Sequence, residues 1–471
     1  MHVLFLCLKC VSIGAFFSVF FGFSITAYAA DILISGGTII DIYSGKERVA
    51  DILIHDDKIS FVGSAKNSKL PSNLHKIDAA GKYIIPGLWD MHVHLTFYPE
   101  LKEHLPALYI ANGVTSVRDM GSQLDEVLAF KEYLSKENRV GPHIWLAGPI
   151  VDASPRVFDG RSPTQPNISI AANSPDEAIA TVNYLAAKGV NLIKPYMELS
   201  PDTFFALVKQ AKTHHLPVAG HIPNRVSLAE AVAAGMDDIQ HLGGHHAKQD
   251  CSQLSKVTSA KKNKDSENAK ILNEAHADVK ASSISCTALI QQYVENGTWH
   301  TPTLVNSIGP HALGFYQDPV WTSAFRLLPE PLGLQFEEFQ KKYDATFYNS
   351  DWSFGITKKM HKAGVKFLAG TDSPPTPNLM PGYGLHFELN ALVQAGLSPL
   401  EALQAATINP ATFFSVESTQ GSIEKGKVAD LVLLDADPLL NINHTQKINM
   451  VIANGKVFDR SELDSLLNFN D

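Results

Sequence analysis

Two histidines separated by one residue, His92 and His94, form the sharpest chemical signal in the chain. They end an apolar stretch, residues 84–94, that has the character of a β-strand. Because residues i and i+2 project from the same face of a strand, both imidazoles are expected to point the same way. Neutral imidazole is a good ligand for Zn²⁺, so the pair predicts a metal site. On its own, such a pair also arises by coincidence.

Four more polar residues occupy equivalent positions further along the chain: Lys194, His221, His241 and Asp372. Each ends a separate apolar stretch that is predicted to be a strand. Any one of them alone is better explained as a structural residue, but parallel strands bring their carboxyl ends to one face. Together with the two histidines, these residues predict a single metal-dependent catalytic centre.

Lys194 ends an apolar stretch and is therefore expected to be buried. Burial and nearby cations lower the pKa of a lysine and favour the neutral amine. A neutral amine can take up CO₂ to form a carbamate, whose two oxygens can bridge two metal ions. The alternatives are a lysine that extends to the solvent or one that pairs with Asp372. The neighbouring histidines favour the carbamate.

Eight apolar stretches with a strand signature alternate with helical patterns and must position these residues. They are residues 84–94, 114–118, 143–147, 190–194, 218–221, 238–241, 299–304 and 365–372. Helix starts are predicted at Ser200 and at Ser398, where Ser398 and Glu401 form a capping box. Eight strand–helix units predict an α/β fold, a (β/α)₈ TIM barrel. Two long inserts, residues 245–290 and 306–350, would emerge at its catalytic face as lids or substrate walls.

The two ends of the chain consist of short alternating segments separated by turns. Residues 31–41 have the pattern strand, turn, strand, and further strands are predicted in 50–62, 429–435 and 449–457. Chain termini often meet in space, so both ends are expected to form one discontinuous small β-sandwich domain. The predicted division is a signal peptide at 1–30, the sandwich at 31–85 and 416–471, and the hydrolase barrel at 86–415.

Composition and the first thirty residues indicate the compartment. The 471 residues are 45% hydrophobic with a net charge of −9, which argues against nucleic acid as a partner. Residues 1–30 contain an apolar run and end in a small-x-small motif, typical of a signal peptide, although an uncleaved membrane anchor is the alternative. We expect an exported protein, periplasmic or secreted, without a stable membrane anchor after cleavage. Cys251 and Cys286 would then either form a disulfide or remain free thiols.

The pattern of these residues resembles the amidohydrolase superfamily, particularly its imidazolonepropionase-like and Xaa-Pro dipeptidase-like members. The resemblance covers essentially the whole mature chain, including the trailing segment 421–431. It implies two divalent metal ions: His92, His94 and Asp372 would bind one, His221 and His241 the other, and carboxylated Lys194 would bridge them. Imidazolonepropionase and many deaminases lack this lysine and use one metal. Ligand type favours zinc, with Mn²⁺, Co²⁺ and Fe²⁺ open.

The resemblance also implies a metal-dependent hydrolase that acts on carbon–nitrogen bonds. A metal-bridging hydroxide would attack an amide carbonyl, and the catalytic residue Asp372 would pass the proton to the leaving amine. We expect a small-molecule substrate, a dipeptide (Xaa-Pro-like) or an N-acyl amino acid. A lactonase or phosphotriesterase-type esterase on the same binuclear site is the alternative. A noncatalytic member is disfavoured because every ligand is present.

Substrate contacts and assembly are less clearly indicated by the sequence. Tyr196, Arg225 and His300 are candidate substrate-binding residues, each with a structural role as the alternative. Arg118 and Asp119, after the second strand, are interpreted as an internal ion pair. The sequence does not indicate the oligomeric state, so a homo-oligomer stays open.

Overall fold

The computed structural model describes residues 31–66, 70–136, 139–162, 165–241, 284–306, 350–374 and 380–467. The predicted signal peptide and Cys251 lie outside these ranges, as do most residues of the two predicted inserts. Within them, no helix combines the length and the apolar character that a membrane crossing requires. Cys286 is buried and disulfide-bonded, so the alternative of a free thiol at this position is wrong.

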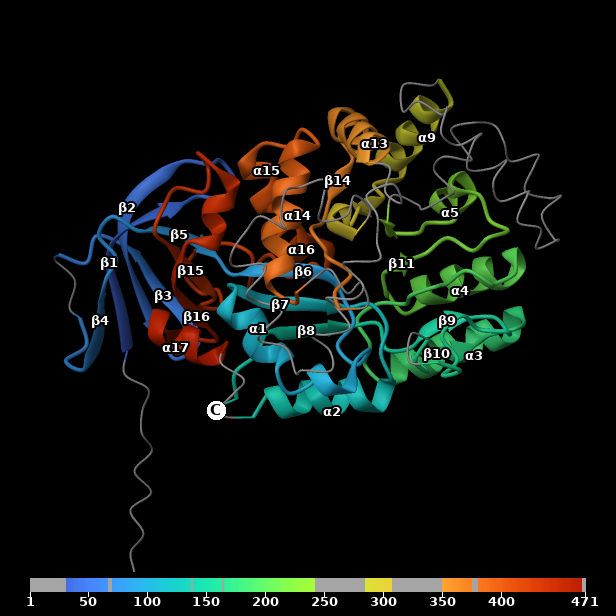
Figure 1. Cartoon of the computed structure of the whole chain (residues 1–471), viewed down its shortest axis with the longest axis horizontal. Helices are drawn as coiled ribbons and strands as arrows, with labels where there is room; N and C mark the ends of the chain where they lie inside the picture. Colours follow the sequence, from blue (N-terminus) through green and yellow to red (C-terminus); the bar gives the residue numbers. More distant parts are fainter. Residues whose placement is uncertain are drawn as a thin grey trace, which may run out of the picture.

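Both ends of the described chain contribute to one eight-stranded sheet at one end of the molecule (Figure 1). The strand order is β17 (Lys456–Phe458), β16 (Ile448–Ala453), β15 (Leu431–Leu434), β5 (Tyr83–Pro86), β1 (Asp31–Ile40), β2 (Glu47–His55) and β3 (Lys58–Gly63), with β4 (Leu74–Asp78) paired to β1. Because β15 pairs antiparallel with β5, the sheet joins segments that are far apart in the sequence. Buried aliphatic side chains from both ends, such as Ile52 and Leu431, pack in one cluster. The two-layered packing of a sandwich and the predicted boundaries stay predictions.

The turn predicted within residues 31–41 is wrong, because β1 is continuous through Gly36 and Gly37. The register with β2 shifts between Ile34 and Gly37, as in a β-bulge. Gly36 has φ 72°, a left-handed conformation that glycine adopts readily. A Cβ at Gly37 would overlap the side chain of Ile84. The two glycines therefore bend one strand and do not reverse the chain.

The middle of the chain forms parallel sheets alternating with helices, as predicted. One sheet contains β6 (Leu88–Val93), β7 (Val114–Asp119) and β8 (His143–Leu146); another contains β11 (Ala219–Gly220), β12 (Asp238–Gln240), β13 (Trp299–Thr301) and β14 (Lys366–Phe367). A short pair joins β9 (Ile150–Asp152) and β10 (Ser169–Ala171). Seven of the eight predicted strands are thus present, although several are shorter than expected. Residues 190–194 contribute only an isolated bridge between Ile193 and Val218.

Backbone hydrogen bonds connect the two larger parallel sheets on both sides, on one side through residues 191–193. The amide of Asn191 donates to the carbonyl of Leu146 at the end of β8, over 2.8 Å. On the other side, the amide of Met91 in β6 donates to the carbonyl of Ala369 after β14, also over 2.8 Å. The architecture is therefore α/β and TIM-barrel-like. A closed barrel of eight regular strands stays a prediction.

Helices cover these strands on the outside (Figure 1). They are α1 (Leu105–Ala111), α2 (Leu124–Leu134), α3 (Pro175–Ala187), α4 (Pro201–Thr213), α5 (Leu228–Ala233), α9 (Ile284–Asn296), α13 (Ser350–Ala363), α14 (Tyr383–Gln394), α15 (Pro399–Ala405) and α16 (Ile408–Phe413), with 3₁₀ turns at Pro99–Leu101 and Ile442–Gln446. The last helix, α17 (Arg460–Leu466), packs instead against α1 and against β16 and β17 of the eight-stranded sheet. Both predicted helix starts are confirmed. The Ser200 hydroxyl accepts from the amide of Thr203, and Ser398 forms the capping box with Glu401.

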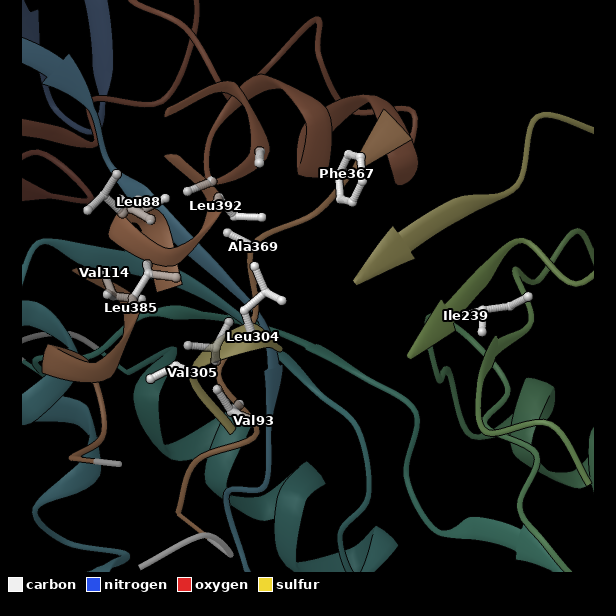
Figure 2. Close-up of a cluster of buried hydrophobic side chains, with 14 of the residues drawn as sticks. Leu88, Val93, Val114, Ile239, Leu304, Val305, Phe367, Ala369, Leu385 and Leu392 are labelled. Carbon is white, nitrogen blue, oxygen red and sulfur yellow. The ribbon is translucent and has the colours of Figure 1, made fainter. Parts of the chain in front are cut away.

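The largest apolar core lies between the parallel strands and the helices that cover them. Figure 2 shows part of it, with Val93 of β6, Leu304 and Val305 after β13, and Leu385 and Leu392 of α14. Burial of each such side chain contributes about 1.5–3 kcal/mol. The strand ends that carry the polar residues are therefore held against a packed apolar layer.

Candidate metal centre

The structure places all six predicted centre residues at or just beyond the carboxyl ends of the middle segments. They are His92 and His94 of the β6 segment, Lys194 after the Ile193 bridge, His221 after β11, His241 after β12 and Asp372 after β14. The six residues therefore share one face of the fold, as their positions at strand ends predict.

Three of these residues, His92, His94 and Asp372, converge on one point and are called the inner triad below. Nε2 of each histidine lies 3.3 Å from Oδ1 of Asp372. The ligand atoms of the triad all lie within 4.8 Å of one another. The amide of Asp372 also donates to the carbonyl of His92 over 2.7 Å, which fixes β6 beside the β14 segment. Two imidazoles and one carboxylate are a donor set that suits a divalent metal ion.

Hydrogen bonds direct both histidines of the triad toward this point. Nδ1 of His92 lies 2.6 Å from Oε1 of Gln240, and Nδ1 of His94 lies 2.9 Å from the carbonyl oxygen of Gly121. Both partners are acceptors, so Nδ1 carries the proton and the Nε2 lone pair faces Asp372. Burial, reinforced by the positive charge of Lys194, lowers the pKa of His92 well below its usual value. The neutral, ligating form of this imidazole is therefore favoured.

Asp372 remains ionised although it lies among buried groups. Burial raises the pKa of this carboxyl, but His241, His94 and Lys194 outweigh that effect and hold it below its usual value. Oδ1 faces the two histidines of the triad, while Oδ2 accepts from Nδ2 of Asn306 over 2.7 Å. The φ of Asp372 is 61°, a left-handed conformation that costs of order 1–3 kcal/mol and often occurs at functional sites.

The other two histidines, His221 and His241, form what is called the outer pair below. Their ring centroids are 4.7 Å apart, and the ring of His241 lies 4.7 Å from that of His92. Nδ1 of His241 is 2.7 Å from the hydroxyl of Thr303. Burial lowers the pKa of His241 to about 4, so this ring is also neutral. The outer pair therefore lies beside the triad, and its imidazoles are further candidate metal ligands.

Lys194 is buried between the two groups, with 1% of its surface exposed, so the alternative of a side chain extending to the solvent is wrong. Its Nζ lies 3.5 Å from Nε2 of His92. Burial lowers the pKa of Lys194 to about 8; Asp372 and Asp119 oppose that shift, and Arg118 adds to it. About a tenth of this amine is therefore neutral at pH 7, far more than for a lysine with the usual pKa of 10.5.

Of the predicted substrate contacts, Tyr196 lies at the centre. Its ring centroid is 4.4 Å from that of His221, and it belongs to a small apolar cluster with Phe97 and Phe158. Phe97 in turn lies edge-on to His94, with centroids 6.2 Å apart. Burial raises the pKa of the Tyr196 phenol, so the hydroxyl stays protonated and can donate. These aromatic rings form an apolar wall beside both histidine groups.

Arg225 and His300 are placed differently. Arg225 is exposed, and its Nη2 donates to the carbonyl of Glu198 over 3.2 Å. His300 of β13 is fully buried, edge-on to Tyr293 of α9 and to Phe367 of β14, with centroids 5.8 Å away in both cases. His300 thus packs among aromatic rings and not against the inner triad, and burial, together with the nearby His241, lowers its pKa to about 3.

The interpretation of Arg118 and Asp119 as an ion pair is wrong. Nη2 of Arg118 lies 2.6 Å from Oδ2 of Asp238 on β12, and both side chains are fully buried. Asp119 accepts instead from the amide of Leu95 and the hydroxyl of Ser122. Adjacent residues of a strand project to opposite faces, so Arg118 and Asp119 cannot both point into the same space.

Three residues that support the centre were missed by sequence reasoning: Gln240, Thr303 and Asn306. Each contacts one candidate ligand, namely His92, His241 and Asp372 respectively. Gln240 directly precedes a candidate ligand, which is the only sequence signal for any of them.

A model of the amidohydrolase family matches residues 83–262 and 353–458, more than half of the chain, and these ranges contain all six centre residues. Among curated proteins, the chain is 44% identical to a dihydroorotase of Pelotomaculum thermopropionicum over 64 residues, 14% of each protein. It is 23% identical to adenine deaminase 1 of Desulfotalea psychrophila over 416 residues, 86% of this chain and 54% of that protein. The imidazolonepropionase of Symbiobacterium thermophilum is 35% identical over 111 residues, 23% of this chain and 25% of that protein. The matched stretches thus span about half or less of these relatives.

Several solved structures share the fold over almost the whole chain. Bottromycin amidohydrolase has a TM-score of 0.68 at 20% identity, covering 92% of this chain and 88% of that one. A Xaa-Pro dipeptidase with methionine bound in its active site has a TM-score of 0.65 at 20% identity, covering 91% and 100%. The A. niger ochratoxinase has a TM-score of 0.61 at 19% identity, covering 91% and 96%. At these identities the likeness establishes the fold.

Proposed function

Because the chain belongs to the amidohydrolase family, we propose that it is a metal-dependent hydrolase that cleaves a carbon–nitrogen amide bond in a small-molecule substrate. The observation that carries this proposal is the inner triad, in which two Nε2 atoms lie 3.3 Å from the same carboxylate oxygen of Asp372. Each histidine is already fixed through Nδ1, as in protein metal sites.

We propose that the centre binds two metal ions. The inner triad would hold one ion and the outer pair, His221 and His241, the other. Bound divalent ions would polarise the scissile carbonyl and supply a water nucleophile at neutral pH. We propose zinc as the metal. The buried, neutral imidazoles and the ionised Asp372 are in the protonation states that such ligands need.

Lys194 would join the two groups as a carbamate. Its neutral Nζ would attack the carbon of CO₂, so that a nitrogen–carbon bond forms while one carbon–oxygen π bond and one N–H bond break and a proton is released. The resulting anion would supply two oxygens as ligands. The lowered pKa of Lys194, about 8, favours this reaction, because only the unprotonated amine has the lone pair that it requires.

Asp372 would move the proton of the reaction. Its Oδ1 faces the triad histidines, which leaves Oδ2 to take the proton from the attacking water and to deliver it to the leaving amine. Asn306 donates to this same Oδ2 and so orients the carboxylate. The two oxygens of one side chain thereby serve separate functions.

For the substrate we propose a dipeptide of the Xaa-Pro type or an N-acyl amino acid. The likeness in fold to a Xaa-Pro dipeptidase and the apolar wall of Tyr196, Phe97 and Phe158 support an apolar group next to the scissile bond. The Tyr196 hydroxyl could donate to a substrate carbonyl. The exposed Arg225 is our candidate for binding a carboxylate.

A substrate panel tests this proposal. Purified protein loaded with Zn²⁺ is assayed against Xaa-Pro dipeptides, N-acyl amino acids, simple lactones and phosphotriesters. We expect hydrolysis of the amides and its loss after chelation, with recovery when the metal is restored. Hydrolysis of phosphotriesters or lactones alone would support the alternative esterase activity and overturn the proposed amide substrate.

We also propose that residues 1–30 are a signal peptide and that the protein acts in the periplasm or outside the cell. The disulfide at Cys286 supports this placement, because disulfides persist in oxidising compartments. Sequencing the N-terminus of protein recovered from the periplasm or the medium tests it. We expect cleavage near residue 30, whereas an intact N-terminus in the membrane fraction would contradict it.

A further inference from the structure

The side chain of Gln240 connects the inner triad to a buried ion pair. Its Oε1 lies 2.6 Å from Nδ1 of His92, and its Nε2 donates to Oδ2 of Asp238. Asp238 in turn is paired with Arg118, over 2.6 Å. All of these side chains are at least 98% buried, so water does not compete for the hydrogen bonds. The function proposed above uses His92 but none of the other three.

The chemistry of Asp238 determines which way the Gln240 amide points. Its carboxylate receives three sets of donors: Nη2 of Arg118, the hydroxyl of Thr301 and Nε2 of Gln240. A carboxylate can only accept hydrogen bonds, so the NH₂ group of Gln240 must face Asp238. The amide oxygen is then left to face His92. The negative charge of Asp238 therefore determines the orientation of the Gln240 amide.

We propose that Gln240 is a positioning residue that selects the Nδ1-protonated form of His92 and directs Nε2 toward the metal of the inner triad. An acceptor at Nδ1 requires a proton there, and the lone pair then lies on Nε2, 3.3 Å from Oδ1 of Asp372. The ion pair between Arg118 and Asp238 holds Gln240 in this orientation. The inference rests on the proposed function only in taking the inner triad as a metal site.

An amide suits this position better than a carboxylate would. A glutamate at 240 would place a second negative charge against Asp238, which costs free energy in a buried site. Gln240 instead matches one donor to Asp238 and one acceptor to His92 without adding charge. The second triad histidine, His94, uses the backbone carbonyl of Gly121. Of these two acceptors, Gln240 is the one that a substitution can remove.

The β12 segment explains how Gln240 can lie next to an outer-pair ligand and still contact the inner triad. Alternation along a strand directs Asp238 and Gln240 to the interior, and would direct the next residue, His241, away from it. His241 has φ 57°, and this left-handed conformation ends the strand and turns its ring back toward His92. One short segment thereby serves both metal positions.

The experiment compares metal binding by wild type, Gln240→Met and Gln404→Met, using a competing chelator and Zn²⁺. Gln404 is a matched control, because its amide donates to the carbonyl of Ile42. We expect Gln240→Met to weaken binding at the tighter site by about 10–100-fold, the range found for residues that orient metal ligands. Gln404→Met should bind as wild type does. Thermal unfolding of the metal-free variants reports on the fold separately.

A double variant that preserves the net charge, Asp238→Asn with Gln240→Glu, tests whether the metal affinity lost in Gln240→Met can be restored. It restores an acceptor to Nδ1 of His92 and leaves one negative charge near Arg118, so most of the lost affinity should return. Unchanged binding by Gln240→Met would overturn the inference, and so would weak binding that the double variant does not restore in a folded protein. A wild-type protein that binds no zinc would instead refute the proposed function.

A second measurement does not depend on any variant. Nitrogen NMR of histidine-labelled, metal-free wild-type protein, with His92 assigned, reads its tautomer directly. The Nδ1–H form is expected. An Nε2–H form would overturn the inference even if Gln240→Met failed to fold.

Discussion

The inner triad and the outer pair are adjacent, with the rings of His92 and His241 4.7 Å apart, yet they are held by different means. The triad lies on two neighbouring segments that are joined by a backbone hydrogen bond between Asp372 and His92. Both of its histidines have an acceptor at Nδ1, one from the backbone and one from a buried side chain. In the outer pair, His241 contacts a hydroxyl of the segment after β13, and His221 packs against the ring of Tyr196.

This difference teaches that the two proposed metal positions are not equally preorganised. Ligand atoms that are already directed at one point lose little freedom when an ion binds. The triad meets that condition without the ion, whereas the outer pair would be completed by the carbamate on Lys194. We therefore expect the triad to bind its metal more tightly, and the predictions below test that order.

The largest effect is expected for Asp372→Asn. The change removes the charge that faces both triad histidines and the group proposed to carry the proton, so kcat should fall by about 10²–10⁴-fold. Steady-state kinetics with the best amide substrate, together with metal analysis, would measure it. Wild-type kcat in a folded variant would remove Asp372 from the mechanism and the triad from the centre.

Lys194→Ala should separate the two positions. Without the carbamate, the outer pair loses its link to the triad, so bound metal should fall from two ions to about one per chain. The activity should fall by on the order of 10²-fold. Elemental analysis after gel filtration gives the metal count. Lys209→Ala, an exposed lysine of α4, is the matched control. Two tightly bound ions in the Lys194 variant would contradict the bridging role.

Glu388 of α14 tests how the segment after β13, which contacts both groups of ligands, is held in place. This buried carboxyl accepts from the amide of Val305 over 2.8 Å, and burial raises its pKa to about 8. It thereby fixes the segment after β13, from which Thr303 contacts His241 and Asn306 contacts Asp372. Glu388→Ala leaves buried amide groups without an acceptor and should reduce the free energy of unfolding by about 1–3 kcal/mol per group.

Glu388→Gln is the control for this change. The carboxyl is mostly protonated at pH 7, because its pKa is about 8, so a neutral amide of the same shape should cost much less than alanine. Denaturant unfolding measures both variants. Equal losses for alanine and glutamine would show that charge, and not the hydrogen bond to Val305, matters at this position.

The pH dependence of CO₂ uptake sharpens the assignment of Lys194. Because its pKa is about 8 instead of the usual 10.5, the neutral fraction of the amine should rise from about 10% at pH 7 to about 90% at pH 9. Carbamate formation by metal-free protein should rise over the same interval. Carbon NMR with labelled bicarbonate measures it, with Lys194→Ala as the blank. Uptake that begins only above pH 10 would contradict a depressed pKa.

The sequence predicts those residues of the centre that can be recognised by their type and their position at the end of an apolar stretch. His92, His94 and Asp372 end apolar stretches and have ligand chemistry, so type and position sufficed. Gln240 and the partner of Arg118 could not be found in this way. Arg118 and Asp238 are 120 positions apart in sequence, and their contact depends on how far β7 and β12 lie from each other across the interior.

The fold was predictable to a similar extent. The alternation of strands and helices could be read because apolar runs and caps are local signals, as at Ser398. The length of each strand could not, since residues 190–194 make only one bridge. The sequence at Gly36 fits a turn as well as a bulge because glycine permits both, and only pairing with β2 decides between them.

The smallest effect is expected for Tyr196→Phe, which tests the aromatic wall beside the outer pair. Phenylalanine keeps the ring contact with His221, at 4.4 Å, and removes only the hydroxyl. If that hydroxyl donates to a substrate carbonyl, its loss should cost about 0.5–1.5 kcal/mol, or roughly 2- to 13-fold in kcat/KM, with both metals retained. Tyr196→Ala removes the wall as well and should also raise KM for substrates with an apolar side chain. A loss of metal from Tyr196→Phe would instead mean that the hydroxyl supports the outer pair, and the contrast with the triad would then extend to this residue.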